Sequence, residues 1–384
     1  MKITRTFHPI GQGAFYTEEF HFESDKTYRV VFDCGGNENI IGNIVKNAFY
    51  HRDEDSPQTV IDAVFISHFD DDHVNGLPFL FQYYDVRNLV LPLLSKEDAL
   101  KYSYDLCHIK GDIIFFKDLL NAMIDERVQS FNDCHVVHVS LASEDDTFDN
   151  TDPISISRLG AVTTVKSIKP EKSFDWIFAC FNYGNENKQR TNQFLNELKK
   201  RNINTFTNLV YPNNVDKFID EYKSDNNHFR ELIKQAYNEV KGTMNGNSMV
   251  TYSGPISLSK SLIKHYHLRH IINKVCICCC GFYKPGCIYF GDYEAKGKNK
   301  WKKFLSFYNH LWNNVGVVQV PHHGSIHNYN SNINTDPKLN IINAKSKNSY
   351  RHPSARVLKE IVHSRGVIVW IKENDSPLIE IIEI

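Results

Sequence analysis

The sequence predicts an α/β protein in which two β-sheets pack against each other between outer helices. Apolar, β-branched runs of strand length fall into two blocks, one before residue 185 and one after residue 247. In both blocks, segments with apolar residues at helical spacing separate the strands. Two blocks of this kind suit a four-layer sandwich, with the helices outside and the two sheets inside.

The first block begins with a strand meander that ends in a turn of sequence Asp-Cys-Gly-Gly at residues 33–36. A buried strand is expected at residues 64–66, because this run is apolar and rich in β-branched residues. Other expected strands occupy parts of 8–16, 20–22, 28–32, 86–91, 135–139 and 174–183, and expected helices span 39–50, 77–84, 97–104 and 113–127.

The second block supplies the second sheet, with a helix at 355–361. Its expected strands span 248–253, 275–280, 287–290, 315–320 and 367–371. The segment that contains His265, His267 and His270 is expected to be helix and loop. Residues 185–242 are polar, charged and helically periodic. We therefore predict one domain that spans residues 1–384, with a helical insertion at 185–242.

Composition favours a cytoplasmic protein that makes no contact with membranes. The chain has 384 residues, of which 41% are hydrophobic, and no apolar stretch approaches the twenty or so residues of a membrane span. The first residues lack the apolar core of a signal peptide. Nine irregularly spaced cysteines are typical of reduced thiols in the cytosol. A net charge of −1 gives no overall attraction for nucleic acids or anionic lipids.

Four potential metal ligands follow the strand at 64–66 within six residues: His68, Asp70, Asp72 and His73. Alternation along an extended backbone would place the first three on one side, and the turn into Gly76 would bring His73 to the same point. So many imidazoles and carboxylates at a strand end are costly to desolvate unless a cation neutralises them. The loop therefore predicts a metal site, and the alternative is a solvated acidic loop.

Two later segments offer further ligands. Asp292 follows an apolar strand in a Gly-Asp turn, and glycine there lets the backbone approach a metal cluster closely. The run Pro-His-His-Gly-Ser at 321–325 follows another apolar strand and contains His322 and His323. Of these two histidines, His323 is the better candidate ligand because it stands directly before the glycine.

These motifs carry a family resemblance. The run His-x-Asp-x-Asp-His at 68–73 resembles the His-x-His-x-Asp-His signature of the metallo-β-lactamase superfamily, with Asp70 in the place of the second histidine. The run at 321–325 is similar to that of the branch that includes the soluble domain of the DNA-uptake protein ComEC. Residues 247–250 and 348–354 resemble the same branch, whereas 185–242 has no counterpart in it.

The resemblance implies two divalent metal ions and a role for each site residue. One ion would be held by His68, Asp70 and Asp292, and the other by Asp72, His73, Asp292 and His323. Asp33 would brace the ligand loop. Asp72 would also orient the water, and His352 or His322 would contact the substrate or its leaving oxygen. Where the superfamily's middle histidine normally falls, the chain has Asn247 and Ser248. Three carboxylates among the ligands make the site richer in oxygen than the usual zinc cluster, so that Mn²⁺ or Mg²⁺ is expected alongside Zn²⁺.

The function implied is hydrolysis of phosphodiester bonds, with a metal-bound hydroxide as the nucleophile. Basic residues at 296–303, and Lys345, Lys347 and Arg351, are expected to flank the cleft, which suits a nucleic acid or nucleotide substrate. The insertion at 185–242 could be a lid, a substrate clamp or a docking surface for a protein partner. Two alternatives stay open: hydrolysis of a lactone, thioester or amide on the same fold, and a non-catalytic binding module with a degenerate metal site.

Overall fold

The computed structural model describes most of the chain and places it in a mixed α/β fold, as the sequence predicts. The described residues are 1–49, 58–94, 102, 106, 109, 111–143, 146–148, 153–183, 187–203, 227–240, 248–257, 265–272, 275–278 and 284–384. The helix expected at 97–104 lies almost wholly outside these ranges. No helix within them is both long and apolar enough to cross a lipid bilayer.

The first sheet has 11 strands and is organised around the N-terminal meander. Strands β1 (Lys2–Phe7), β2 (Phe15–His21) and β3 (Thr27–Cys34) are antiparallel. Beyond β3 the sheet becomes parallel through β5 (Ala63–Phe65), β7 (Asn88–Pro92) and β9 (Cys134–Val139). The edges are completed by β8 (Ser130–Phe131) and β11 (Thr164–Val165) on one side, and by β21 (Leu378–Glu383), β15 (His265–Ile272) and β16 (Val275–Cys278) on the other.

The second sheet has eight strands in the order β10-β12-β13-β14-β17-β18-β19-β20. Its last four strands are parallel: β17 (Gly286–Tyr289), β18 (Val315–Gln319), β19 (Leu339–Asn343) and β20 (Val367–Ile371). The other four are β10 (Ile154–Ser155), β12 (Ser167–Lys169), β13 (Ile177–Phe181) and β14 (Val250–Gly254). A separate pair is formed by β4 (Val60–Ile61) and β6 (Asp85–Val86).

The two sheets pack face to face through aromatic side chains. Phe32 of the first sheet stacks on Tyr289 of the second with 4.0 Å between ring centroids. Phe65 and Phe178 join them in one buried cluster. Successive strand residues point to opposite faces of the first sheet, as the two-residue period of a strand requires. Phe65 therefore joins the cluster between the sheets, whereas Val64 joins the apolar core under the helices.

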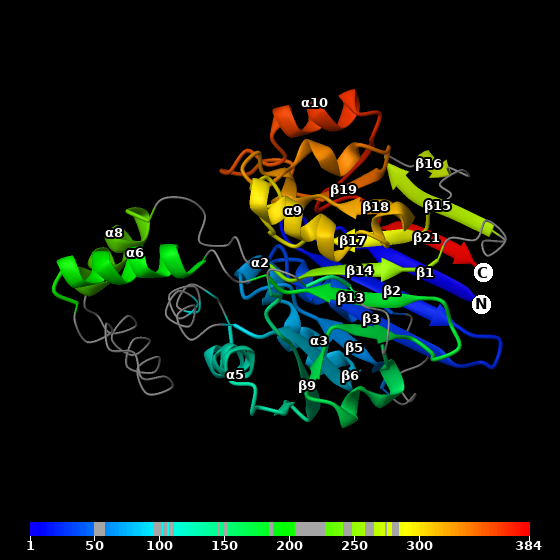
Figure 1. Cartoon of the computed structure of the whole chain (residues 1–384), viewed down its shortest axis with the longest axis horizontal. Helices are drawn as coiled ribbons and strands as arrows, with labels where there is room; N and C mark the ends of the chain where they lie inside the picture. The colour runs from blue at the N-terminus through cyan, green and yellow to red at the C-terminus, as the bar shows by residue number, and fades with distance from the viewer. Residues whose placement is uncertain are drawn as a thin grey trace.

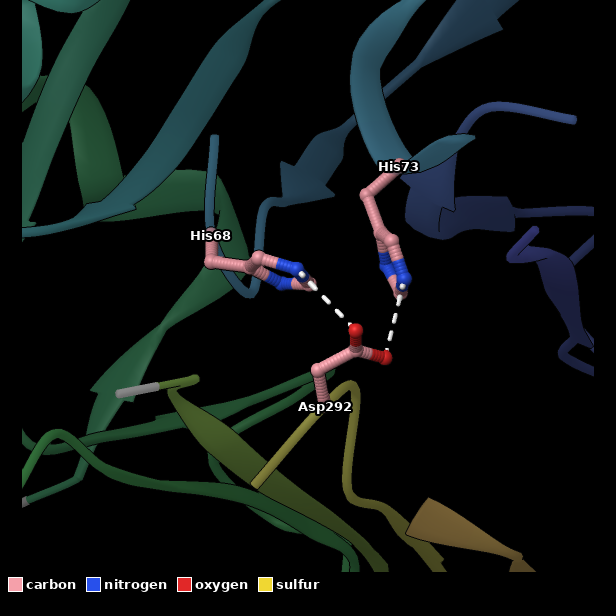
Figure 2. Close-up of side chains that lie close together, drawn as sticks. All are labelled: His68, His73 and Asp292. Atoms are coloured by element: carbon pink, nitrogen blue, oxygen red, sulfur yellow. Dashed lines mark ion pairs between the residues drawn. The ribbon is translucent and has the colours of Figure 1, made fainter. Parts of the chain in front are cut away.

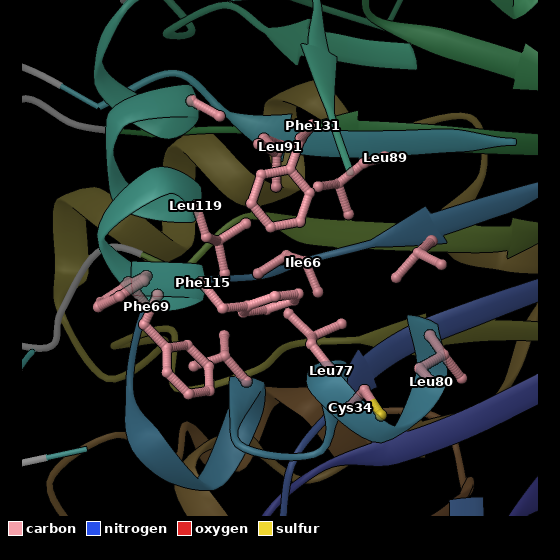
Figure 3. Close-up of a cluster of buried hydrophobic side chains, with 14 of the residues drawn as sticks. Cys34, Ile66, Phe69, Leu77, Leu80, Leu89, Leu91, Phe115, Leu119 and Phe131 are labelled. Carbon is pink, nitrogen blue, oxygen red and sulfur yellow. The ribbon is translucent and has the colours of Figure 1, made fainter. Parts of the chain in front are cut away.

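Helices cover the outer faces of both sheets (Figure 1). Helices α1 (Ile41–Lys46), α3 (Leu77–Tyr83) and α5 (Ile113–Ile124) share an apolar core with the first sheet, part of which Figure 3 shows. Helices α9 (Lys298–Phe307) and α10 (Ala355–His363) share another with the second sheet. Leu89 and Leu91 of β7 reach the first of these cores from alternate positions.

The segment predicted to be a helical insertion contains α6 (Asn187–Lys200) and α8 (Asn227–Asn238). These helices lie at the left of Figure 1 and pack on each other through a small core of their own. They interrupt the chain between β13 and β14, which are neighbours in the second sheet. Residues 184–186, 204–226 and 241–247 of this region lie outside the described ranges.

Two expectations about secondary structure are wrong. Residues 8–14 form no strand, because the strand expected within 8–16 begins only at Phe15. The segment with His265, His267 and His270 is strand β15 and not helix and loop. It pairs with β21, which follows β1 in the sheet, so that it lies several strands away from β5. The polar residues of β15 hide its strand character because the strand lies near an edge of the sheet. Strands β19 and β21, which the sequence analysis did not identify, complete the two sheets.

A buried ion cluster lies between the sheets. Arg5 of β1 is fully buried and its Nε lies 2.6 Å from Oε1 of Glu18. Its guanidinium also contacts the buried carboxylate of Glu380. Glu18 accepts further hydrogen bonds from Ser253 and Tyr289 of the second sheet. The cluster therefore ties three strands of the first sheet to the second.

Candidate metal centre

The predicted ligands lie where parallel strands of both sheets end. His68 follows β5 of the first sheet, whereas Asp292 and His323 follow β17 and β18 of the second. Because the carboxyl ends of parallel strands meet at one edge of a sheet, these loops converge at the same end of the molecule. The short helix α2 (Asp71–Val74) then places His73 beside His68.

The first ligand group consists of His68, His73 and Asp292, all buried (Figure 2). Nε2 of His68 lies 3.7 Å from Oδ2 of Asp292, and Nε2 of His73 lies 3.3 Å from Oδ1. One carboxylate thus faces two imidazoles, one through each oxygen. These three side chains could hold one metal ion. They support the metal-binding part of the prediction, and the second ion needs a second group.

A second group overlaps the first and consists of Asp72, His73 and His323. Nε2 of His323 lies 3.1 Å from Oδ2 of Asp72 and 3.9 Å from Oδ1 of Asp292. The division of ligands differs from the expected one, because His73 rather than Asp70 joins His68 and Asp292. Asp70 lies beside the first group, with Oδ2 3.4 Å from Nε2 of His68.

Hydrogen bonds at Nδ1 fix how the three imidazoles face the site. Nδ1 of His73 lies 2.9 Å from Oδ2 of Asp33, and Nδ1 of His323 lies 3.0 Å from the carbonyl of Asn343. Nδ1 of His68 lies 2.9 Å from Oγ of Ser67, which donates to Asp33. In this orientation each Nε2 faces the carboxylates, and displacement of its proton by a bound cation would leave the Nδ1-protonated tautomer that metal-binding histidines use.

Ser248 contacts one candidate ligand from each sheet, His68 and Asp292. The sequence predicts no role for it. Its Oγ lies 3.1 Å from Nδ1 of His68 and accepts a hydrogen bond from the backbone N–H of Asp292 at 2.8 Å. Ser248 precedes β14, which is antiparallel to β17, so that it reaches the edge at which β17 ends. The available signal was its position at the start of a strand, where the resemblance leads one to expect a histidine.

Two glycines allow the ligand loops to approach the sheet closely. A Cβ on Gly35 would lie 2.5 Å from the backbone nitrogen of His73. Gly291 has a φ of +53° and a Cβ there would lie 2.7 Å from Oγ of Ser67. Both positions therefore require a residue without a side chain.

Several ligand atoms are buried with unused hydrogen-bonding capacity. Within the described part of the chain, Nε2 of His68, His73 and His323 and Oδ1 of Asp292 make no hydrogen bond of acceptable geometry. Leaving buried polar atoms without such partners costs about 1–3 kcal/mol each. Nitrogen and carboxylate donors that converge in this way fit a divalent cation such as Zn²⁺ or Mn²⁺.

The pKa shifts of Asp292 and His73 reflect the pairing of carboxylates with imidazoles in the cluster. Burial acts to raise the pKa of Asp292, but the imidazoles of His322 and His73 hold it well below its usual range. Burial acts to lower the pKa of His73, but Asp292 and Asp33 raise it well above 6.5. Each carboxylate is thus kept charged by neighbouring imidazoles, and a bound cation would take over this role from their protons.

The two histidines predicted to contact substrate lie at one side of the ligand groups. Nδ1 of His322 is 3.5 Å from Oδ2 of Asp292, and the rings of His322 and His352 are 5.5 Å apart. Burial, with His322 and His323 nearby, lowers the pKa of His352 to about 4. His352 is therefore a neutral imidazole at pH 7 that can donate a hydrogen bond.

The expected basic residues divide into exposed and buried ones. Lys300 is buried and its Nζ lies 3.0 Å from Glu294, so the expectation that it faces a substrate is wrong. Lys347 and Arg351 are exposed on the loop that leads to His352. The exposed lysines of the 296–303 segment are Lys296, Lys298 and Lys302.

No protein family matches this chain, and none of the curated proteins matches its sequence.

Proposed function

We propose that this chain is a metal-dependent hydrolase of the metallo-β-lactamase type that cleaves phosphodiester bonds. The observation that carries the proposal is the pair of adjoining ligand groups, which meet at His73 and Asp292. The single free Nε2 of His73 can bind only one ion, so the carboxylate of Asp292 is the group able to join two. Asp292 faces His73 and His323 through Oδ1 and His68 through Oδ2. Adjoining groups of this kind suit two metal ions a few ångströms apart, which is the arrangement used for displacement at phosphorus.

The fold supports the same proposal. Two sheets with helices on their outer faces, and ligands at the carboxyl ends of the strands, match what the resemblance to the metallo-β-lactamase superfamily implies. The loop at 68–73 and the Pro-His-His-Gly-Ser run at 321–325 meet at one site although they lie about 250 residues apart.

The roles of the residues follow from their positions. His68, His73, Asp72, Asp292 and His323 would hold the metal ions, with Asp70 beside them. When bound, two divalent ions would supply a hydroxide nucleophile at neutral pH and neutralise charge on the phosphoryl oxygens. His352, as a neutral imidazole, would donate a hydrogen bond to the leaving oxygen. His322 would orient the substrate beside Asp292.

An activity screen tests the proposal. The protein is stripped with a chelator, reloaded with Zn²⁺ or Mn²⁺, and assayed on plasmid DNA, RNA, bis-p-nitrophenyl phosphate and a chromogenic β-lactam. We expect cleavage of a phosphodiester that is lost in Asp292→Ala and kept in His310→Ala. His310 serves as the control because it is exposed and precedes β18, whereas the ligand His323 follows the carboxyl end of that strand. Cleavage of the β-lactam alone would instead show acyl hydrolysis, and a chain that binds metal without any activity would be a binding module.

A further inference from the structure

Tyr350 exposes an aromatic ring beside the candidate metal centre. Its relative exposure is 73%, the highest among the exposed large apolar and aromatic side chains of the described residues. A single exposed aromatic ring is common on protein surfaces. This one is distinguished by its neighbour, because it lies nearly parallel to the ring of His352, at 17° and with 6.0 Å between centroids.

A row of rings leads from the metal ligands to Tyr350. His322 lies 3.5 Å from Asp292, the ring of His352 lies 5.5 Å from that of His322, and Tyr350 follows. Nδ1 of both His322 and His352 is buried and makes no hydrogen bond within the described residues. The described residues therefore leave the hydrogen-bonding capacity of these two atoms unused.

The loop that presents these rings is fixed in place. The side chain of Asn348 accepts a hydrogen bond from the N–H of His352 at 2.9 Å and donates one to its carbonyl at 2.6 Å. The next residue but one, Ser354, donates its backbone N–H to the carbonyl of Gly324 in the Pro-His-His-Gly-Ser turn. The platform of His352 and Tyr350 therefore keeps its position relative to His322 and His323.

The charge on this loop suits a polyanion. Lys347 and Arg351 flank Tyr350, and both are exposed. Neither forms an ion pair with any residue that the structure describes. Unpaired cations around an exposed aromatic ring are the combination that single-stranded nucleic acids recognise, because phosphates meet the cations while bases stack on the ring.

We propose that Tyr350 and His352 form a stacking platform for an unpaired base next to the scissile phosphate, so that the substrate is a single-stranded nucleic acid. The inference rests on the proposed phosphodiesterase function and adds the class of substrate. A duplex would fit poorly, because both faces of its bases are already stacked on their neighbours and cannot lie on Tyr350.

Cleavage assays test the substrate class. Labelled single strands, the same strands with abasic residues and the corresponding duplex are compared with wild type, Tyr350→Ala and Tyr350→Phe. We expect Tyr350→Ala to raise KM for the normal strand about tenfold, as loss of one stacked base predicts, and Tyr350→Phe to keep it. On the abasic strand, wild type and Tyr350→Ala should not differ. Equal KM values of wild type and Tyr350→Ala on the normal strand would overturn the proposal.

A binding measurement separates this inference from the proposed function. Tyr350→Trp, loaded with metal, is titrated with a phosphorothioate strand that resists cleavage, and the fluorescence change is compared with that of wild type under the same titration. We expect quenching by the normal strand and none by the abasic strand. If wild type cleaves no phosphodiester, the proposed function fails. The fluorescence titration still shows in that case whether a base stacks on the platform. If wild type cleaves single strands and no quenching occurs, the platform alone is refuted.

Discussion

Asp33 accepts a hydrogen bond from Nδ1 of His73 across 2.9 Å, and its carboxylate also receives the backbone N–H and the hydroxyl of Ser67. Asp33 is the last residue but one of strand β3, whereas His73 lies in α2, so that this one carboxylate joins the first sheet to the ligand loop. The bond fixes the tautomer of His73 and directs Nε2 toward Asp292. The bracing role that the resemblance implied for Asp33 agrees with these contacts.

Replacing Asp33 should weaken metal binding without removing a ligand. We expect Asp33→Ala to lower the affinity for Zn²⁺ about 10- to 100-fold, because His73 loses its orienting partner. Isothermal titration calorimetry of the chelator-stripped protein measures this. Asp85→Ala is the control, since Asp85 is exposed on β6. Equal affinities in wild type and Asp33→Ala would show that the hydrogen bond does not orient the ligand.

His352→Ala should separate metal binding from catalysis. His352 lies beyond His322 from Asp292, so that we expect its removal to leave the metal content unchanged. Loss of a hydrogen-bond donor to the leaving oxygen should lower kcat about 100-fold. Steady-state kinetics and metal analysis of the same preparation measure both quantities. A variant that loses its metal would instead make His352 a ligand.

Arg5→Met should destabilise the protein strongly. The change leaves the buried carboxylates of Glu18 and Glu380 without their cation, and breaking a buried ion pair costs about 3–5 kcal/mol. Urea unfolding gives the loss in free energy. The triple variant with Glu18→Gln and Glu380→Gln should regain part of it, because the uncompensated charges are gone. A single variant within about 1 kcal/mol of wild type would contradict the cluster's role.

Lys338 should make stability depend on pH in the alkaline range. It is buried with Nζ 4.9 Å from the centre of the Trp312 ring, and burial lowers its pKa to about 8 from 10.5. Between these pH values the unfolded chain binds the proton and the folded chain does not, so that stability rises with pH. Below pH 8 the cost of burying the charge is fully present.

The matched variant for this prediction is Lys338→Met. The stability that Lys338→Met gains over wild type should be largest at pH 7. This gain should shrink by about 2 kcal/mol between pH 8 and 10, because wild type becomes more stable over this range. Urea unfolding at a series of pH values measures the difference. A constant difference over this range would mean that Lys338 titrates normally in the folded state.

The candidate ligands stand out in the sequence because each lies in a strong local pattern. His68 and His73 flank a dense acidic loop after a buried strand, and His323 belongs to an unusual Pro-His-His-Gly-Ser run. The class of fold follows from the two blocks of strands and helices for the same reason. Local patterns of this kind are visible without knowledge of distant contacts.

The arrangement of those ligands depends on contacts between distant residues, which the sequence does not display. His73, rather than Asp70, shares the first group with Asp292, because α2 turns its imidazole toward the second sheet. Ser248 gains its role only when β14 pairs with β17. Strand β15 has too many polar residues to be recognised before its pairing with β21 is known.

The most direct test of the central claim is the metal content of the protein after chelator treatment, incubation with Zn²⁺ or Mn²⁺, and gel filtration, measured by mass spectrometry of the elements. Wild type and His310→Ala should retain at least one ion per chain, and Asp292→Ala should lose most of it, because Asp292 faces ligands of both groups. A wild-type protein that elutes with neither metal would contradict the metal centre, and with it the hydrolase.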